Sequence, residues 1–256
     1  MRPTVSPPLL IRDVEFGGPK PLFCVPLVAK GLDDLLAQAK VAREVSADVV
    51  EWRADFHIGL NAETASEVVR QLRNVLDREL LIFTLRIKAE GGNNEMNEAE
   101  RLSCILAVLQ TAMIDFVDIE LVNSPSFIQE VRDTAKGRAR VIMSFHDFSR
   151  TPDAEFLFSK ISDMVQHGAD IAKIACMPQN REDVLRLLDV TLRARKAFPS
   201  VPLCTMSMGG LGRLTRVAGF LCGSDMAFAV GREVSAPGQI PIEEARGIAQ
   251  SLLRDS

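Results

Sequence analysis

The run Asp170-Ile171-Ala172-Lys173-Ile174-Ala175-Cys176 has the apolar character of a strand, yet it carries a lysine at its centre. Lysine is rarely fully buried without a partner, because transferring an unpaired ammonium out of water is very unfavourable. Two interpretations of Lys173 remain open. Its stem packs at an edge while its head reaches water, or burial lowers its pKa and leaves a neutral amine that forms a Schiff base with a carbonyl.

Strand-like and helix-period runs alternate on both sides of this segment. The pattern predicts strands over Leu22–Val28, Asp48–Arg53, Leu80–Arg86, Phe116–Leu121, Arg140–Phe145, Asp170–Cys176, Leu203–Ser207 and Met226–Val230. It predicts helices over Leu32–Val45, Ala62–Asp77, Glu98–Thr111, Pro125–Thr134, Asp153–His167, Arg181–Ala197, Arg213–Leu221 and Ile242–Leu253. Eight strands that are each followed by a helix favour an α/β fold, the (β/α)8 TIM barrel. An open doubly wound sheet shares the alternation, but no Gly-x-Gly-x-x-Gly turn follows the first strand.

The chain has 256 residues, 47% of them hydrophobic and 25% charged, which is enough for one large core. We expect a single catalytic domain over residues 21–256. A Pro- and Gly-rich extension over residues 1–20 precedes it and is expected to cover the bottom of the barrel. Pro7-Pro8 and Arg12-Asp13 interrupt the extension, so it does not have the pattern of a signal peptide. No apolar run reaches the length of a membrane span.

The net charge bears on the partners of the protein, and the cysteines bear on its compartment. The net charge is −4 and there is no long basic run, which argues against nucleic acid as a partner. The five cysteines form no Cys-x-x-Cys pair, and their odd number suggests a reducing compartment. We therefore expect a cytoplasmic protein that has neither a membrane nor a nucleic acid as its partner.

Catalytic groups of such barrels lie where the strands end, and several polar residues occupy these positions. Glu51, Arg53 and Asp55 alternate after the second strand and share one face. They form either an ion pair that closes the barrel mouth or a polar floor that binds substrate hydroxyls. Arg86 ends the third strand, and Glu90 follows it on a loop that belongs either to the solvated surface or to a site.

His146 follows the fifth strand and is the only one of three histidines at a catalytic strand end. An ordinary pKa of about 6.5 suits a proton shuttle. Its position one strand from Lys173 favours acid–base catalysis over a structural role. The sequence has no His-Glu-x-x-His motif and no cysteine cluster, so we expect no metal site.

Two later loops each allow two interpretations. The glycine-rich turn over Gly209–Gly212 either cradles a phosphate with its backbone N–H groups or merely turns the chain. In the second case Arg216 presents a planar fork to a carboxylate. The loop that contains Ser235 and Gln239 is either a lid or an ordinary surface turn.

Together these segments resemble the type I 3-dehydroquinate dehydratase family. The matching segments follow the family's order and are Glu51–Asp55, Thr84–Arg86 through Glu90–Gly92, Ser144–Phe148, Ala172–Ile174, Met206–Gly209 through Arg216, and Ser235–Gln239. Thr215 stands where the family pattern has serine, and residues 1–20 have no counterpart. No shikimate dehydrogenase-like domain is attached, so the chain resembles the monofunctional form.

The resemblance implies a homodimeric (β/α)8 barrel that dehydrates 3-dehydroquinate to 3-dehydroshikimate on the route to chorismate, with no metal or organic cofactor. It implies that Lys173 forms an imine with the C3 ketone. His146 then removes a C2 proton and protonates the departing C1 hydroxyl, and Glu90 orients His146. It assigns the substrate carboxylate to Arg216 and the ring oxygens to Glu51, Arg53, Arg86, Ser235 and Gln239. We expect the nearby arginines to help keep Lys173 neutral.

Two other functions stay open at this point. A class I aldolase that acts on a phosphorylated sugar shares the barrel and the lysine, and it needs the Gly209–Gly212 turn to hold phosphate. A barrel-shaped binding or regulatory protein retains the pocket and binds ligand without dehydrating it.

Overall fold

The computed structural model describes residues 2–231, 238 and 240–254. Its strands are β1 (Leu9–Ile11), β2 (Val14–Phe16), β3 (Leu22–Leu27), β4 (Val49–Arg53), β5 (Leu80–Thr84), β6 (Phe116–Glu120), β7 (Arg140–Asp147), β8 (Ile171–Cys176), β9 (Leu203–Ser207) and β10 (Met226–Phe228). Its helices are α1 (Leu32–Glu44), α2 (Ala62–Val75), α3 (Glu98–Gln110), α4 (Pro125–Ala135), α5 (Ala154–Gln166), α6 (Arg181–Ala197), α7 (Arg213–Ala218) and α8 (Ile242–Leu253). Short 3-10 turns are η1 (Ala54–Phe56), η2 (Lys88–Glu90) and η3 (Gly219–Cys222).

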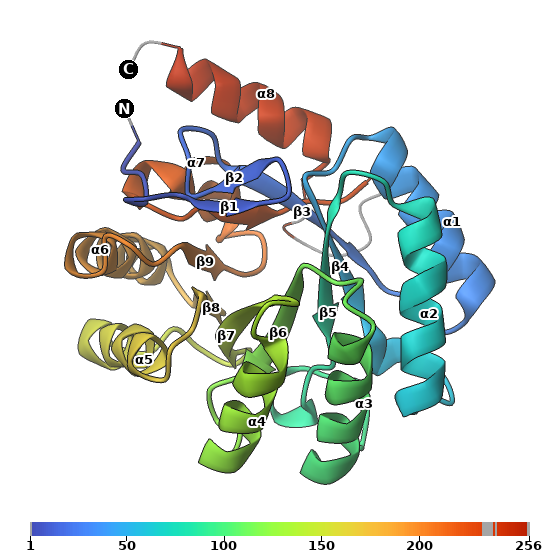
Figure 1. Cartoon of the computed structure of the whole chain (residues 1–256). Helices are drawn as coiled ribbons and strands as arrows, with labels where there is room; N and C mark the ends of the chain where they lie inside the picture. The colour runs from blue at the N-terminus through green and yellow to red at the C-terminus, as the bar shows by residue number, and fades with distance from the viewer. Residues whose placement is uncertain (1, 232–237, 239, 255–256) are drawn as a thin grey trace.

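The eight strands β3 to β10 form one parallel sheet in the order β10-β3-β4-β5-β6-β7-β8-β9, and the helices surround it (Figure 1). The predicted (β/α)8 barrel is confirmed, and the open doubly wound alternative is wrong. Strands β9 and β10 close the ring through the Asp225 amide, which donates to the Leu203 carbonyl at 2.6 Å. No helix within the described ranges is long and apolar enough to cross a membrane.

Some predicted bounds were wrong at the strand ends that carry polar residues. β7 extends to Asp147 because His146 and Asp147 still pair with β8, so His146 lies on the strand and not after it. β5 ends at Thr84, which places Arg86 beyond the strand. The helix predicted to continue to Leu221 ends at Ala218, where the chain tightens into η3.

Side chains inside the barrel change from apolar to polar along the strands. The lower layer is a packed apolar cluster that includes Leu22, Val49, Leu80, Ile82, Phe116, Ile142, Ile171 and Met226. The layers above it carry the buried polar side chains of Glu51, Thr84, Asp118, Glu120, Ser144 and Lys173. Residues two positions apart on a strand face the same side, so Ile171 and Lys173 belong to successive layers. The fold thus sets a charged layer directly above an apolar plug.

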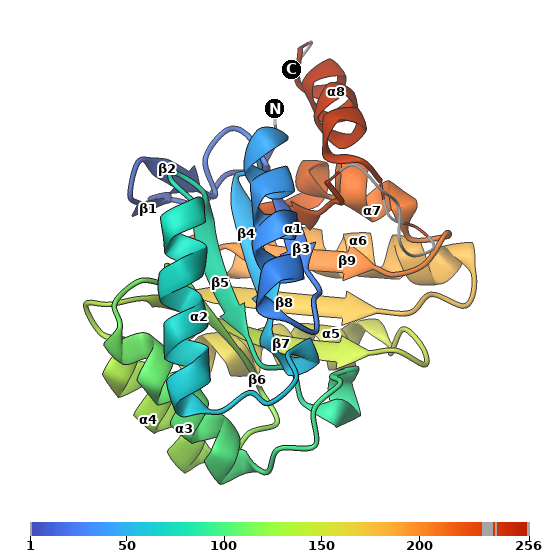
Figure 2. The same ribbon diagram turned by 90° about the vertical axis from the view of Figure 1, so that its right-hand side faces the viewer.

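The N-terminal segment closes the bottom of the barrel. Strands β1 and β2 form an antiparallel hairpin at the end where the barrel strands begin (Figure 2). Phe16 is fully buried in the apolar plug, and its ring meets Phe116 edge-on with centroids 5.6 Å apart. The hairpin therefore seals the end opposite the strand C-termini.

An aspartate stands just before every second barrel strand and makes the same two hydrogen bonds each time. In each case the amide donates to a carbonyl on the preceding strand, and that residue's amide donates back to Oδ2 at 2.8 Å. The four pairs are Asp48 with Phe23, Asp115 with Leu81, Asp170 with Val141, and Asp225 with Leu203. Each carboxylate satisfies a backbone donor at the rim of the sheet.

Each of these aspartates also meets arginine, but the four differ in burial. Asp225 is fully buried and contacts both Arg2 and Arg195, which are themselves buried. The carboxylate of Asp48 is partly exposed and contacts Arg246 at 3.2 Å. The Arg2 contact ties the N-terminal segment to the β9–β10 junction.

Candidate active site

A cavity of about 300 Å³ opens among the C-terminal ends of the strands. It brings together most of the side chains that the sequence predicted for a site, namely Glu51, Arg53, Arg86, Glu90, His146, Lys173 and Arg216. Its apolar walls include Met206, Met208 and Phe228. Ser235 and Gln239 lie outside the described residues.

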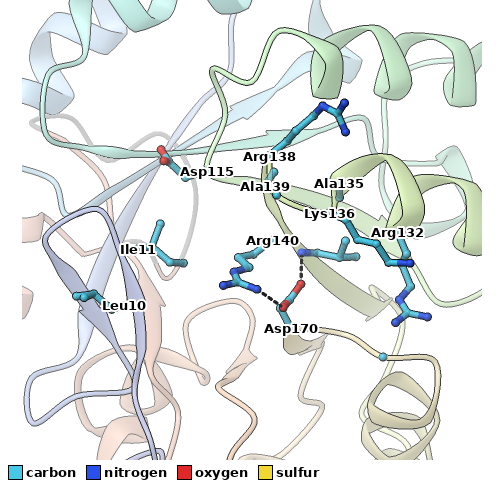
Figure 3. Close-up of a pocket in the computed structure, with 13 residues that line it drawn as sticks. Leu10, Ile11, Asp115, Arg132, Ala135, Lys136, Arg138, Ala139, Arg140 and Asp170 are labelled. Carbon is cyan, nitrogen blue, oxygen red and sulfur yellow. Dashed lines mark hydrogen bonds and ion pairs between the residues drawn. The ribbon is translucent and has the colours of Figure 1, made fainter.

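Two other cavities lie away from these residues. One of about 440 Å³ is at the bottom of the barrel beside the β1–β2 hairpin (Figure 3). There Arg140 faces Asp170 at 3.4 Å, whereas Arg138 points away from the cavity. Another, of about 660 Å³, lies between the start of β3 and α8. Neither of these two cavities is lined by a histidine or by a buried lysine. The 300 Å³ cavity, which His146 and Lys173 line, therefore has the better chemistry for catalysis.

Lys173 is buried in the charged layer and is not at an exposed edge. Only 3% of the residue is exposed. Its Nζ donates to Asp118 Oδ2 at 2.7 Å and to Glu51 Oε1 at 3.2 Å. The ring of Phe228 lies 4.6 Å from the same nitrogen. Two carboxylates and an aromatic face therefore compensate for the removal of this ammonium from water.

The expectation that arginines keep Lys173 neutral is wrong for the unliganded protein. Burial alone lowers the pKa of Lys173, but Asp118 and Glu51 outweigh burial, and the pKa is raised above its ordinary value. Arg86 opposes this shift without cancelling it. The resting lysine is therefore an ammonium, and it has to lose protons as it condenses with a carbonyl.

Asp118 and Glu120 on β6 were missed by the sequence analysis. Arg86 contacts both, with Nη2 3.0 Å from Asp118 and Nη1 2.8 Å from Glu120. Burial alone would raise the pKa of Asp118, but the positive charges of Arg86 and Lys173 outweigh burial and hold this pKa well below its ordinary value. The available signal was their spacing: acids two positions apart in an apolar strand share a face with Phe116, inside the barrel.

His146 and Glu90 form a hydrogen-bonded pair at the cavity wall. Glu90 Oε2 accepts the backbone N–H of His146 at 2.9 Å and lies 2.9 Å from its Nδ1. An oxygen that already accepts one N–H suits a second, so Nδ1 is assigned the proton and Nε2 keeps a free lone pair. Burial, assisted by Arg86 and Lys173, lowers the pKa of His146 well below its ordinary value. The imidazole is therefore neutral near pH 7 and able to accept a proton.

Glu90 is a source of pH-dependent instability. Burial raises its pKa to about 8 from an ordinary value of 4.5, although Arg86 opposes the shift. Between these two values the unfolded chain binds fewer protons at this position than the folded one, so stability falls as pH rises.

We expect Glu90→Gln to remove this loss of stability at high pH. It should also lower kcat, because an amide cannot ionise to stabilise a protonated imidazole. At pH 8.5 its Tm should exceed that of the wild type by roughly 2–4 °C for each ~1 kcal/mol recovered, whereas at pH 5 the gain should vanish. Thermal melts at both pH values measure the difference, with the exposed Glu130→Gln as the control. An equal effect at both pH values would contradict the assigned burial cost.

A second network anchors the loop that carries Glu90. Arg53 makes two 2.8 Å bonds to Asp55 and a third, at 3.2 Å, to the Gly91 carbonyl. Gly91 has a φ of +83°, and a Cβ there would overlap the ring of Phe148. That ring stacks on His146 with centroids 6.3 Å apart. Arg53 and Asp55 thus form the ion pair at the barrel mouth, and they also position the Glu90 loop.

The glycine-rich turn after β9 is held by hydrogen bonds within the turn and to β9. The amides of Arg213 and Thr215 donate to the carbonyls of Gly210 and Gly212. Thr215 Oγ1 donates to Gly212 O at 2.8 Å and accepts the Ser207 amide at 3.0 Å, which fixes the turn to β9. These bonds favour the interpretation in which the glycines only let the chain turn towards Arg216.

Arg216 presents a poorly compensated cation to the cavity. Its Nη1 donates to the Phe228 carbonyl at 3.0 Å, but its buried Nε has no hydrogen-bond partner in the described structure. Burial lowers its pKa. No ion pair to Arg216 is found among the described residues, so a carboxylate on a ligand would complete its surroundings.

Comparisons with known proteins place this geometry in context. The type I 3-dehydroquinase family model matches residues 23–255. A 3-dehydroquinate dehydratase of Syntrophotalea carbinolica is 42% identical over 245 residues, covering 94% of this chain and 96% of that protein. The crystal structure of 3-dehydroquinate dehydratase from Geobacillus kaustophilus HTA426 matches with a TM-score of 0.95 at 38% identity and covers 100% of both chains. A type I enzyme from Clostridium difficile, with covalently modified comenic acid, matches with a TM-score of 0.94 at 34% identity over 97% of this chain and 99% of that one.

Proposed function

The chain belongs to the type I 3-dehydroquinase family, and from this premise we propose that it dehydrates 3-dehydroquinate to 3-dehydroshikimate. The reaction is a hydro-lyase step of the shikimate pathway, which leads to chorismate and the aromatic amino acids. The single observation that carries the proposal is that a buried lysine and a neutral histidine line one cavity from the adjacent strands β8 and β7.

In the proposed mechanism Lys173 condenses with the C3 ketone to give an iminium. The iminium is a stronger electron sink than the ketone, so the adjacent C2–H becomes acidic enough for an imidazole. His146 removes this proton and then returns one to the departing C1 hydroxyl, which leaves as water. Glu90 holds the ring so that Nδ1–H faces Oε2 of Glu90 and Nε2 is free to act.

Substrate binding is assigned to the cationic and acidic rim of the cavity. Arg216 takes the carboxylate, for which its unpartnered Nε and the absence of an ion pair among the described residues are the support. Arg53, Arg86 and Glu51 line the same cavity and are proposed to contact the ring oxygens. Ser235 and Gln239 are proposed for the same role from the family pattern alone.

The direct test is to add 3-dehydroquinate to the purified protein and follow the ultraviolet absorbance of the conjugated product. We expect a rise with wild-type protein in buffer without added metal or cofactor. Tight binding with no rise would instead support a binding protein. Inhibition by low concentrations of inorganic phosphate would favour the aldolase alternative, which the internally bonded turn after β9 does not support.

Loss of Arg216 should weaken substrate binding more than it slows the chemistry. Hydrogen bonds to charged groups contribute about 1.5–3 kcal/mol, so Arg216→Ala should raise KM by about 10–150-fold with a small change in kcat. Steady-state kinetics measure both values. Arg213→Ala is the matched control, because Arg213 lies on the same helix but is exposed. Unchanged KM in the Arg216 variant would remove this residue from the site.

We also propose, from the family resemblance, that the enzyme is a cytoplasmic homodimer. The free state of all five cysteines is consistent with a reducing compartment. Light scattering of the purified protein tests the dimer, and a monomeric mass at working concentration would contradict it.

A further inference from the structure

Among the described residues, Asp118 is the carboxylate that contacts the Lys173 nitrogen most closely, yet it does not line the cavity. Its Oδ2 lies 2.7 Å from Nζ, against 3.2 Å for the Glu51 oxygen. Glu51 borders the cavity, whereas Asp118 is only 1% exposed and lies behind Lys173. Asp118 can therefore influence a ligand only through its neighbours, of which Lys173 and Arg86 line the cavity.

Besides Lys173, two side chains hold Asp118 in place. Arg86 Nη2 lies 3.0 Å from its Oδ2, and Ser144 donates to its Oδ1 at 2.6 Å. Ser144 is also the residue paired with Lys173 across the β7–β8 ladder. The carboxylate is therefore fixed relative to the strand that carries the lysine.

Condensation of an ammonium with a ketone conserves charge at this nitrogen. The C–N bond forms as the C–O bond breaks, two protons leave nitrogen with the ketone oxygen as water, and the remaining N–H belongs to an iminium. Both the reactant and the iminium carry one positive charge in the same place. A fixed anion stabilises both states without having to move or be resolvated.

We propose that Asp118 is a positioning residue that serves as the fixed counterion of the Lys173 nitrogen, first as ammonium and then as iminium. The inference rests on the proposed function and adds a role that lies outside the substrate cavity. Asp118 favours the iminium over the neutral enamine, so it assists the step in which loss of the C1 hydroxyl regenerates an iminium. Asp118 also favours the ammonium over the free amine that attacks the ketone. Condensation should therefore slow down as the pH falls.

The other groups that face Lys173 set the background of this effect. They are Glu51 on β4, Arg86 after β5, His146 on β7, Cys204 on β9 and Cys24 on β3. Removing Asp118 leaves Glu51 as the remaining carboxylate at hydrogen-bonding distance from Nζ among the described residues. The lysine should then release its proton at lower pH.

The test measures borohydride trapping of the imine, and kcat, as functions of pH in Asp118→Asn. The yield of trapped imine should fall towards low pH, and we call this fall the acid limb. In Asp118→Asn the acid limb should lie about 1–3 pH units lower than in the wild type, because a nearby opposite charge shifts a pKa by that amount. We expect kcat to fall by roughly 10²-fold, as for loss of one preorganised electrostatic partner, with little change in KM. A role confined to folding would lower Tm and leave the pH limb where it was.

Glu120→Gln is the matched control. Glu120 lies on the same strand, is buried and binds the same Arg86, but it does not contact Lys173. Its acid limb should match the wild type. Asp118→Glu keeps the charge and should shift the limb less than Asp118→Asn. Asp118→Ser also removes the charge, so it serves as the test variant if the asparagine protein does not fold.

The two proposals fail in different ways. Wild-type protein that is not trapped by borohydride with substrate would overturn the Schiff-base function itself. Trapping of the wild type, together with Asp118→Asn or Asp118→Ser limbs that coincide with those of the wild type and Glu120→Gln, would overturn only the counterion role.

Discussion

Lys173→Ala is expected to lower kcat/KM for 3-dehydroquinate by roughly 10⁴–10⁶-fold, the range seen when a covalent nucleophile is removed. The cavity keeps its shape and its arginines, but it loses the only group proposed to form a covalent bond with the substrate. Ultraviolet assays on wild type and variant measure the loss. Lys40→Ala, at an exposed position of α1, should keep wild-type activity.

Covalent trapping separates the lysine from the histidine. With substrate and borohydride, mass spectrometry should find the adduct on Lys173 of the wild-type protein and none on the alanine variant. His146→Ala should still be trapped, because condensation precedes proton removal, yet its turnover should fall by roughly 10²–10⁴-fold, the usual contribution of a general acid–base. An unmodified Lys173 after this treatment of the wild type would refute the imine.

Asp225→Ala is expected to be the most destabilising single substitution considered for this protein. It leaves the buried guanidinium groups of Arg2 and Arg195 without their shared carboxylate. Breaking a buried ion pair from one side destabilises by about 3–5 kcal/mol. For a chain of this size the Tm should fall by roughly 6–20 °C. The measurement is a thermal melt followed by circular dichroism.

Asp48→Ala is its internal control. Asp48 makes the same two backbone bonds, but its carboxylate and Arg246 are partly exposed, so solvent replaces much of the lost interaction. We expect a loss of about 1 kcal/mol from the backbone hydrogen bond. Equal Tm values for the two variants would show that the Arg2–Asp225–Arg195 group contributes nothing beyond the repeated rim bond.

Local patterns were sufficient for the architecture and for most of the cavity. The alternation of strand and helix periods fixed the number and order of barrel elements, because period and length are properties of each segment. The apolar run around Lys173 singled out that lysine, and the rule that barrel chemistry lies at strand ends selected His146. The bounds of strands were less predictable, because pairing with a neighbour extends β7 through His146.

The charge of Lys173 is a property that the sequence left open and the fold decided. The apolar run around it indicates burial, and burial alone favours a neutral amine. Asp118 and Glu51 lie 55 and 122 positions away in the chain, and only barrel closure brings them to 2.7 and 3.2 Å from its nitrogen. Electrostatic interaction depends on distance in space. The sequence therefore determined which lysine is buried, and the tertiary structure determined that it rests as a cation held by two carboxylates.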